Sequence, residues 1–213
     1  MVAHVKGKAP NFKKIAVVDG IFEEISLSQY EGHYVVLAFV PNAFTYVCPT
    51  EIIAFSEAVD EFHKLDCQVL FVSTDSHFCL SAWTDVSREE GGLGEVKVPL
   101  ISDSNHTMSR DYGVYFAEEG IALRGLFIID PQGIIKHITV NDTPVGRNVE
   151  ETLRIIEAFQ SNDKDGRLLP CNWHPGDQAI MPDFDQFKKS FDELDLQDHC
   201  SENDDDNKSS SPE

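Results

Sequence analysis

Cys48 occupies a position in this chain that favours thiol chemistry. It follows an apolar run at residues 34–40 and a short turn, and Pro49 comes directly after it. Proline is favoured at the first helical position, so the sequence predicts that Cys48 is the N-cap residue. Free backbone N–H groups and the positive end of the helix dipole would then favour the thiolate. A cysteine at a helix start can equally be a small buried apolar residue, and position alone leaves both alternatives open.

Two polar neighbours bear on the charge of the Cys48 sulfur. Thr45 precedes it by three residues, so its hydroxyl can approach the sulfur across the turn. Glu51 falls in the first turn of the predicted helix, and its negative charge opposes a thiolate unless a cation neutralises it. The sequence therefore predicts an arginine close to Glu51.

The elements that must position Cys48 follow from the apolar pattern. Residues 34–40 and 68–74 are runs of β-branched and aromatic residues, which predict two strands buried on both faces. Between them, residues 48–66 carry apolar residues at spacings of three and four, typical of an amphipathic helix: Ile52, Phe55, Val59 and Phe62. Strand, helix and strand in this order predict the right-handed crossover of a parallel sheet.

The rest of the chain adds an antiparallel part to this sheet. A shorter helix is expected at residues 78–86, and extended structure resumes at 98–102 after a glycine-rich breaker. Residues 124–130 and 133–140 are joined by a short turn and predict a hairpin, and a helix follows at 148–159. The predicted fold is α/β, with a mixed central sheet flanked by helices in a thioredoxin-like order.

The predicted domain organisation has three parts. Residues 1–160 form the thioredoxin-like domain, residues 161–197 a turn-rich C-terminal arm, and residues 198–213 a disordered acidic tail without apolar anchors. A short helix near residues 184–196 carries an apolar stripe that can dock on this molecule or on a partner subunit.

Composition excludes several classes of protein. The chain has 213 residues and a net charge of −20, which repels nucleic acid and anionic lipid. No apolar run is long enough to cross about 30 Å of hydrocarbon, and no secretory signal opens the chain. Five cysteines without a Cys-x-x-Cys pair favour a reducing, cytoplasmic setting.

The segment Phe-Thr-Tyr-Val-Cys-Pro-Thr-Glu at residues 44–51 resembles the active-site signature of typical 2-Cys peroxiredoxins, the thioredoxin peroxidases. Four further motifs agree, at residues 91–94, 124–130, 145–152 and 169–173. The last of them and the opening Met-Val-Ala look most like the fungal cytosolic thiol-specific antioxidant proteins. The resemblance covers residues 1–195 and implies a thioredoxin fold and the reduction of hydrogen peroxide and organic hydroperoxides to water and alcohols.

The resemblance implies roles for four residues near the reacting atoms. Cys48 matches the peroxidatic cysteine, whose thiolate attacks the peroxide and becomes a sulfenic acid. Thr45 and Arg124 match the pair that binds substrate and thiolate. Pro41 matches the proline that shields the sulfenic acid from water.

The remaining matches concern the residues that orient Arg124 and the cysteine that reacts with the sulfenic acid. Glu51 and Arg147 match the pair that orients Arg124, and Cys171 matches the resolving cysteine. In the family its disulfide with the peroxidatic cysteine joins two subunits of an antiparallel homodimer, and thioredoxin reduces it. Spacing alone leaves an intrachain link open. A ring of dimers, a decamer, is also implied, with no cofactor and no metal.

The other thiols are expected to be ordinary. Cys67 and Cys79 are predicted to be packing residues, and Cys200 an exposed residue of the tail. Cys171 with His174 could form half of a zinc site, but no second pair has the spacing that a tetrahedral site requires.

Two hypotheses complete the sequence analysis. The alternative function is an oxidant-driven chaperone, or a peroxide sensor that relays oxidation to client thiols. Ser190 stands where easily overoxidised peroxiredoxins carry a tyrosine, so we expect moderate sensitivity of Cys48 to sulfinic acid formation.

Overall fold

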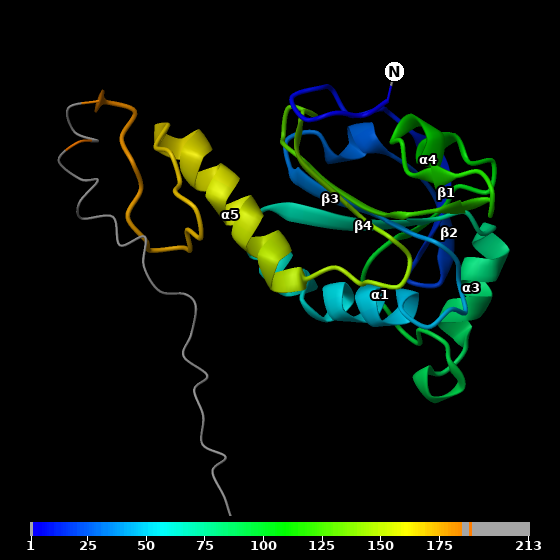
Figure 1. The fold of residues 1–213 in the computed structure, drawn as a ribbon. Coiled ribbons are helices and arrows are strands. Elements are labelled where there is room, and N and C mark those ends of the chain that lie inside the picture. The colour runs from blue at the N-terminus through cyan, green and yellow to red at the C-terminus, as the bar shows by residue number, and fades with distance from the viewer. Residues whose placement is uncertain (1, 185–187, 189–213) are drawn as a thin grey trace, which may run out of the picture. The chain divides into compact units, whose positions relative to one another are not determined.

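A seven-stranded mixed sheet forms the centre of the part of the chain that the computed structural model describes, residues 2–184 and 188 (Figure 1). The strand order is β2-β1-β5-β4-β3-β8-β9. The bounds are β1 Lys13–Val18, β2 Ile21–Ser26, β3 Tyr34–Val40, β4 Cys67–Ser73, β5 Leu100–Ser102, β8 Arg124–Ile129 and β9 Ile135–Asn141. Strands β6 (Tyr115–Phe116) and β7 (Ile121–Ala122) form a separate ladder.

Helices flank this sheet, as predicted. They are α1 Cys48–Glu57, α2 Val59–Lys64, α3 His77–Asp85, α4 Thr107–Asp111 and α5 Val149–Asp165, with short 3-10 turns at Leu27–Tyr30 and Arg88–Glu90. The chain divides into two compact units, Met1–Glu157 and Ala158–Glu213. Among the described residues, no helix is both long and apolar enough to cross a membrane.

Strand β3 sets the geometry of the sheet. All seven of its residues are buried, and it pairs in parallel with β4 and antiparallel with β8, which confirms the predicted crossover and hairpin. The last β3–β8 pair is Ala38 with Leu126, so Arg124 lies at the same end of the sheet as Val40. The chain leaves β3 at that end and enters α1 at Cys48.

Aromatic side chains fix the helices on both faces of the sheet. Phe55 of α1 meets Phe71 of β4 edge to face at 5.6 Å and stacks on Phe62 at 5.7 Å between ring centroids. On the other face, Tyr112 packs against Phe127 and Phe39. Burying one such side chain stabilises the fold by about 1.5–3 kcal/mol, so α1 is firmly anchored behind its first turn.

The predicted helix at residues 48–66 is two helices separated by Ala58. Its apolar stripe is confirmed, since Ile52, Phe55, Val59 and Phe62 are all buried. Ala58 leaves helical geometry at ψ 5°, although no Gly or Pro marks the break. Cys67 begins β4, one residue before the strand predicted at residues 68–74.

The prediction that Cys48 is the N-cap is wrong by one residue. Val47 is the N-cap, because its carbonyl oxygen already accepts the first helical hydrogen bond, from the Glu51 N–H at 3.3 Å. Cys48 is the first helical residue and Pro49 the second. Cys48 still lies in the first turn, where the helix dipole favours an anion.

Two further elements differ from the prediction. Helix α5 extends to Asp165 rather than Phe159, because the polar residues there tolerate a helix until Gly166 adopts a positive φ of 72°. The hairpin β1–β2 was missed, although its Asp19-Gly20 turn is a strong hairpin signal; both residues have positive φ, as such a turn requires.

Several sequence hypotheses fall beyond the described residues. These are most of the short helix predicted at residues 184–196, the tail at 198–213 with Cys200, and the substitution at Ser190.

Candidate active site

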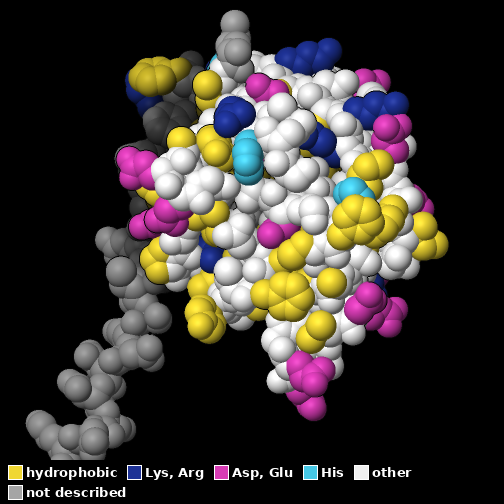
Figure 2. Space-filling model, turned by 90° about the vertical axis from the view of Figure 1, so that its right-hand side faces the viewer, with side chains coloured by type: hydrophobic (Ala, Val, Ile, Leu, Met, Phe, Trp, Pro, Cys, Tyr) yellow, Lys and Arg dark blue, Asp and Glu magenta, His cyan; other side chains and the backbone are white. Residues whose placement is uncertain are grey.

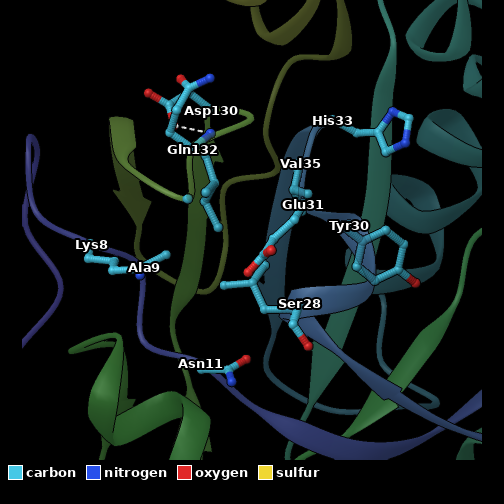
Figure 3. Close-up of a pocket in the computed structure, with 13 residues that line it drawn as sticks. Lys8, Ala9, Asn11, Ser28, Tyr30, Glu31, His33, Val35, Asp130 and Gln132 are labelled. Atoms are coloured by element: carbon cyan, nitrogen blue, oxygen red, sulfur yellow. Dashed lines mark hydrogen bonds between the residues drawn. The ribbon is translucent and has the colours of Figure 1, made fainter.

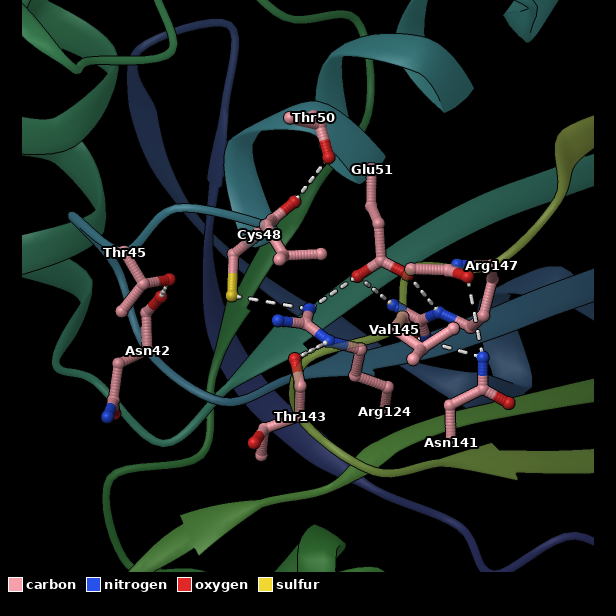
Figure 4. Close-up of polar contacts among 12 residues, drawn as sticks. Asn42, Thr45, Cys48, Thr50, Glu51, Arg124, Asn141, Thr143, Val145 and Arg147 are labelled. Carbon is pink, nitrogen blue, oxygen red and sulfur yellow. Dashed lines mark hydrogen bonds and ion pairs between the residues drawn. The ribbon is translucent and has the colours of Figure 1, made fainter.

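The buried start of α1 faces the start of β8. Cys48 has no exposed surface, and Arg124 is only 2 % exposed. The Arg124 Nη1 donates a hydrogen bond to the Cys48 Sγ at 3.4 Å (Figure 4). These residues are 76 positions apart in the chain, and the antiparallel pairing of β8 with β3 brings them together.

Arg124 is held at both ends of its guanidinium group. Its Nε donates to the Thr143 carbonyl oxygen at 2.6 Å, and its Nη1 also donates to Glu51 Oε2 at 2.7 Å (Figure 4). Such charge-assisted bonds fix the orientation of the fork. The guanidinium therefore presents a fixed positive charge to the sulfur.

Glu51 is the centre of the supporting network. Its Oε1 accepts from the Arg147 backbone N–H at 2.8 Å and from Arg147 Nε at 2.7 Å, and its Oε2 also accepts from Arg147 Nη2 at 2.9 Å. Arg147 in turn donates to the Gly125 carbonyl oxygen, next to Arg124. The predicted arginine neighbour of Glu51 is confirmed, since two arginines bind it.

The charges of this network do not balance without the sulfur. Two guanidinium groups and one carboxylate leave one positive charge, and the side chains of Arg124, Glu51 and Arg147 are at most 3 % exposed. Buried charge is costly unless it is paired. Because the Cys48 sulfur accepts a hydrogen bond from Arg124, an anion at this position would balance that charge.

Pro41 and Thr45 belong to the loop between β3 and α1. Pro41 is buried, and its carbonyl oxygen accepts a hydrogen bond from Thr74 Oγ1 at 3.2 Å. The Thr45 hydroxyl donates to the Asn42 carbonyl oxygen at 2.9 Å (Figure 4). That bond uses its proton and leaves its oxygen lone pairs, so the role of Thr45 toward the sulfur stays a prediction.

Cys171 lies in the second unit, within a loop closed by an antiparallel bridge between Leu168 and Ile180. Its side chain is exposed, and its Sγ lies 3.5 Å from Asn172 Oδ1. Asn172 has a positive φ of 59°, in keeping with the predicted turn-rich segment. An exposed thiol on a surface loop is accessible to an electrophilic sulfur.

The other described thiols have different surroundings. Burial raises the pKa of Cys67 to about 12. Burial and the neighbouring Asp75 carboxylate raise the pKa of Cys79, although Cys79 is only partly buried. The packing role predicted for Cys67 is confirmed by its full burial, whereas Cys79 packs only in part.

Sequence reasoning missed two supports of the site. The Thr143 carbonyl oxygen that binds Arg124 is a backbone atom, which no residue type announces. Asp75 accepts a hydrogen bond from Ala43 in the loop before Cys48, and the carboxylate directly after a buried strand was a signal available in the sequence.

A pocket elsewhere lies by the amino end of β3, away from Cys48 (Figure 3). Val35, Ile129 and Leu27 contribute its apolar lining. Its Asp130 carboxylate accepts from backbone N–H groups of its own turn, and its His33 pairs with Asp66 at 2.6 Å. None of the described residues that line this pocket is a cysteine.

Comparison with known proteins identifies the family of this chain. The model of the AhpC/TSA family matches residues 5–138, and that of the C-terminal domain of 1-Cys peroxiredoxin matches residues 158–193. Peroxiredoxin TSA1 of Saccharomyces cerevisiae is 62% identical over 191 residues, 90% of this chain and 97% of that protein. Peroxiredoxin-2 of Bos taurus is 52% identical over 189 residues, 89% of this chain and 95% of that protein.

A solved structure gives the same result for the fold. The reduced 2-Cys peroxiredoxin of Plasmodium vivax superposes with a TM-score of 0.82 at 41% identity, and the match covers 84% of this chain and 93% of that one. The fold class and the resemblance drawn from the motifs are both confirmed. The chain therefore belongs to the AhpC/TSA family, as a peroxiredoxin of the 2-Cys type.

Proposed function

We propose that this chain, a thiol peroxidase by family, reduces hydrogen peroxide and organic hydroperoxides through Cys48 and is recycled by thioredoxin. Its relatives include proteins named peroxiredoxin and thioredoxin peroxidase. The observation that carries the proposal is the hydrogen bond from the buried Arg124 guanidinium to the Cys48 sulfur at 3.4 Å. The relatives' names do not favour the alternative, a chaperone or peroxide sensor.

The first step is a displacement at oxygen. The Cys48 thiolate attacks the terminal peroxide oxygen, a sulfur–oxygen bond forms as the oxygen–oxygen bond breaks, and both electrons of the broken bond stay with the leaving oxygen. That oxygen takes up a proton and leaves as water or an alcohol, and Cys48 becomes a sulfenic acid.

Arg124 does more than favour the thiolate. Negative charge grows on the leaving oxygen in the transition state, and a preorganised guanidinium stabilises such charge strongly in a buried site. Glu51 and Arg147 keep it in place, so they act through Arg124. Pro41 and the Thr45 hydroxyl complete the substrate side, where the hydroxyl oxygen can accept the peroxide proton.

The second step requires Cys48 to move. Cys48 has no exposed surface, whereas Cys171 is exposed. The first turn of α1 must therefore unwind before the Cys171 thiol attacks the sulfenic sulfur, releasing water and forming a disulfide. Thioredoxin then reduces this disulfide by thiol–disulfide exchange.

The disulfide joins two subunits of a homodimer, which assembles into a ring of dimers, in the cytoplasm. Two surfaces of this chain suit such an assembly. Strand β9 ends the sheet, and Ile135 at its start also exchanges backbone hydrogen bonds with Lys6 and Gly7; beyond Ile135 its outer edge can pair with another chain. A second surface carries the partly exposed Phe22 and Phe78, with rings 5.6 Å apart, and hydrophobic side chains gather on that face in Figure 2.

A coupled assay tests the activity. We expect the protein to consume peroxide with thioredoxin, thioredoxin reductase and NADPH, and Cys48→Ser to fall to the uncatalysed rate because no other thiol faces a cation in the described structure. Turnover by Cys48→Ser, or none by the parent protein, would contradict the proposal.

A non-reducing gel tests the disulfide. After peroxide treatment, the parent protein should migrate as a dimer and Cys171→Ser as a monomer. A parent band that remains monomeric would exclude the intersubunit bond. Cys79→Ser is the matched control and should dimerise like the parent, because its thiol faces a carboxylate.

A further inference from the structure

The loop between β3 and α1, residues 41–47, carries Pro41 and Thr45 but has no regular structure of its own. Phe44 in this loop has a φ of 55°, a conformation unfavourable for a bulky residue. Such a segment keeps one shape only where contacts from outside over-determine it. The position of Thr45, three residues before Cys48, therefore depends on what holds the loop.

The end of β4 provides polar contacts that hold this loop, in addition to the packing of Phe44 on Trp83 at 6.0 Å between ring centroids. The Ala43 N–H donates to Asp75 Oδ2 at 2.7 Å, which ties the middle of the loop to a carboxylate. Thr74 adds weaker bonds from its Oγ1, to the Pro41 carbonyl oxygen at 3.2 Å and to Asn42 Oδ1 at 3.4 Å. The Asp75 bond is the short, charge-assisted one of the set.

Asp75 is itself fixed in place. Ser73 Oγ donates to the same Oδ2 at 2.7 Å, and Ser102 Oγ of β5 donates to the Asp75 carbonyl oxygen at 2.7 Å. The other carboxylate oxygen, Oδ1, lies 3.7 Å from the Cys79 sulfur. The Asp75 carboxylate thus connects the β3–α1 loop with the end of β4, and its backbone carbonyl ties the same residue to the end of β5.

We propose that Asp75 is a positioning residue for the peroxidase reaction, which holds the Ala43 amide and so keeps Pro41 and Thr45 at the Cys48 sulfur. The inference rests on the proposed function, because it assigns Asp75 an effect on peroxide binding. Asp75 positions the loop residues that would meet the peroxide. Arg124, Glu51 and Arg147 instead set the charge beside the sulfur. A change in the loop and a change in the charge network should therefore affect different reactions of Cys48.

The experiment compares two reactions of Cys48 in single turnover. Iodoacetamide reports on the thiolate alone, whereas hydrogen peroxide also needs the loop. Asp75→Ala should lower the peroxide rate constant by about tenfold or more, because misplacing a reacting geometry by about 1 Å can cost up to about a hundredfold. The iodoacetamide rate constant should stay within about twofold, since Arg124 and Glu51 are untouched.

Conservative variants separate positioning from general damage. Asp75→Asn retains an oxygen acceptor for the Ala43 N–H and should recover most of the peroxide rate. Asp66→Asn changes a carboxylate at the other end of β4, and Cys79→Ala removes only the contact to Oδ1; both should react like the parent protein. If Asp75→Ala does not fold, Ser73→Ala, which removes one donor to Oδ2, should still lower the peroxide rate selectively.

Two results would overturn the proposal. One is an unchanged peroxide rate in Asp75→Ala, or in Ser73→Ala if the former does not fold. The other is a parallel fall of the peroxide and iodoacetamide rates in those variants, which indicates disturbance of the whole site. A parent protein that reacts with iodoacetamide but not with peroxide would instead contradict the proposed function.

Discussion

Cys48 and Cys79 both lie in the first turn of a helix, and their sulfurs face opposite charges. The Cys48 sulfur accepts a hydrogen bond from the Arg124 guanidinium, and the Cys79 sulfur donates one to the Asp75 carboxylate at 3.7 Å. Burial and Asp75 together raise the pKa of Cys79. Two cysteines at helix starts therefore have opposite electrostatic environments, set by the sign of the charged neighbour.

Cys67 adds the limiting case of a thiol in an apolar environment. It is fully buried at the start of β4, and burial is the main cause that raises its pKa to about 12. Cys48 is equally buried but has the cation that Cys67 lacks. The two thiols thus differ in the charge beside the sulfur and not in burial.

Removing the Arg124 guanidinium should have the largest effect on the difference in reactivity between Cys48 and the other two thiols. Arg124→Ala is expected to lower the peroxide rate constant by about a hundredfold or more, as loss of a preorganised transition-state donor does. The loss should exceed the loss of thiolate measured by parallel thiol titration, because the guanidinium also stabilises the leaving oxygen. A rate that merely tracked the thiolate fraction would refute this role.

Weakening the support of the cation should have a smaller effect. Arg147→Ala leaves Glu51 bound to Arg124 alone, and breaking a buried ion pair costs about 3 kcal/mol or more of the free energy of unfolding. We expect this loss in urea denaturation, with about a tenfold lower peroxide rate because Arg124 keeps its bond to the Thr143 carbonyl.

Lys64→Ala is the control for Arg147→Ala. Lys64 pairs with Glu61 on the surface, with side chains 68% and 55% exposed, so its loss should cost less than about 1 kcal/mol. Equal destabilisation by the two variants would show that the buried pair has no special weight.

Neutralising the carboxylate beside Cys79 should have the smallest effect. Asp75→Asn removes a negative charge that raises the pKa of Cys79, so this pKa should fall and alkylation of Cys79 at pH 8 should become faster. Burial is the larger cause and remains, so the gain should stay below about tenfold, the change that one pKa unit brings. Pulsed alkylation with peptide mass spectrometry measures it; slower alkylation would contradict the charge argument.

The sequence was most informative where side-chain patterns repeat. The apolar runs predicted β3 and β4, and the hairpin β8–β9 followed from its turn. The break at Ala58 and the extension of α5 had no such signal, because neither depends on a breaker residue or an apolar stripe.

The site was predictable only in part. The position of Cys48 could be derived to within one residue, and the need for a cation near Glu51 followed from charge. Which arginine meets that need could not be derived, since Arg124 comes from 76 residues away and its identification depended on the resemblance. The acceptor from Thr143 is a backbone atom and depends on the fold alone.

Arg124 binds the Cys48 sulfur, and it is also the first residue of the buried strand β8. Successive side chains of a strand point to opposite faces, so a slip of β8 by one residue against β3 would turn the guanidinium to the other face of the sheet. The strands would remain paired, and the thiol would lose its cation. The proposed peroxidase activity therefore depends on the register of β8 against β3, and molecules with a shifted register should lose this activity before they unfold.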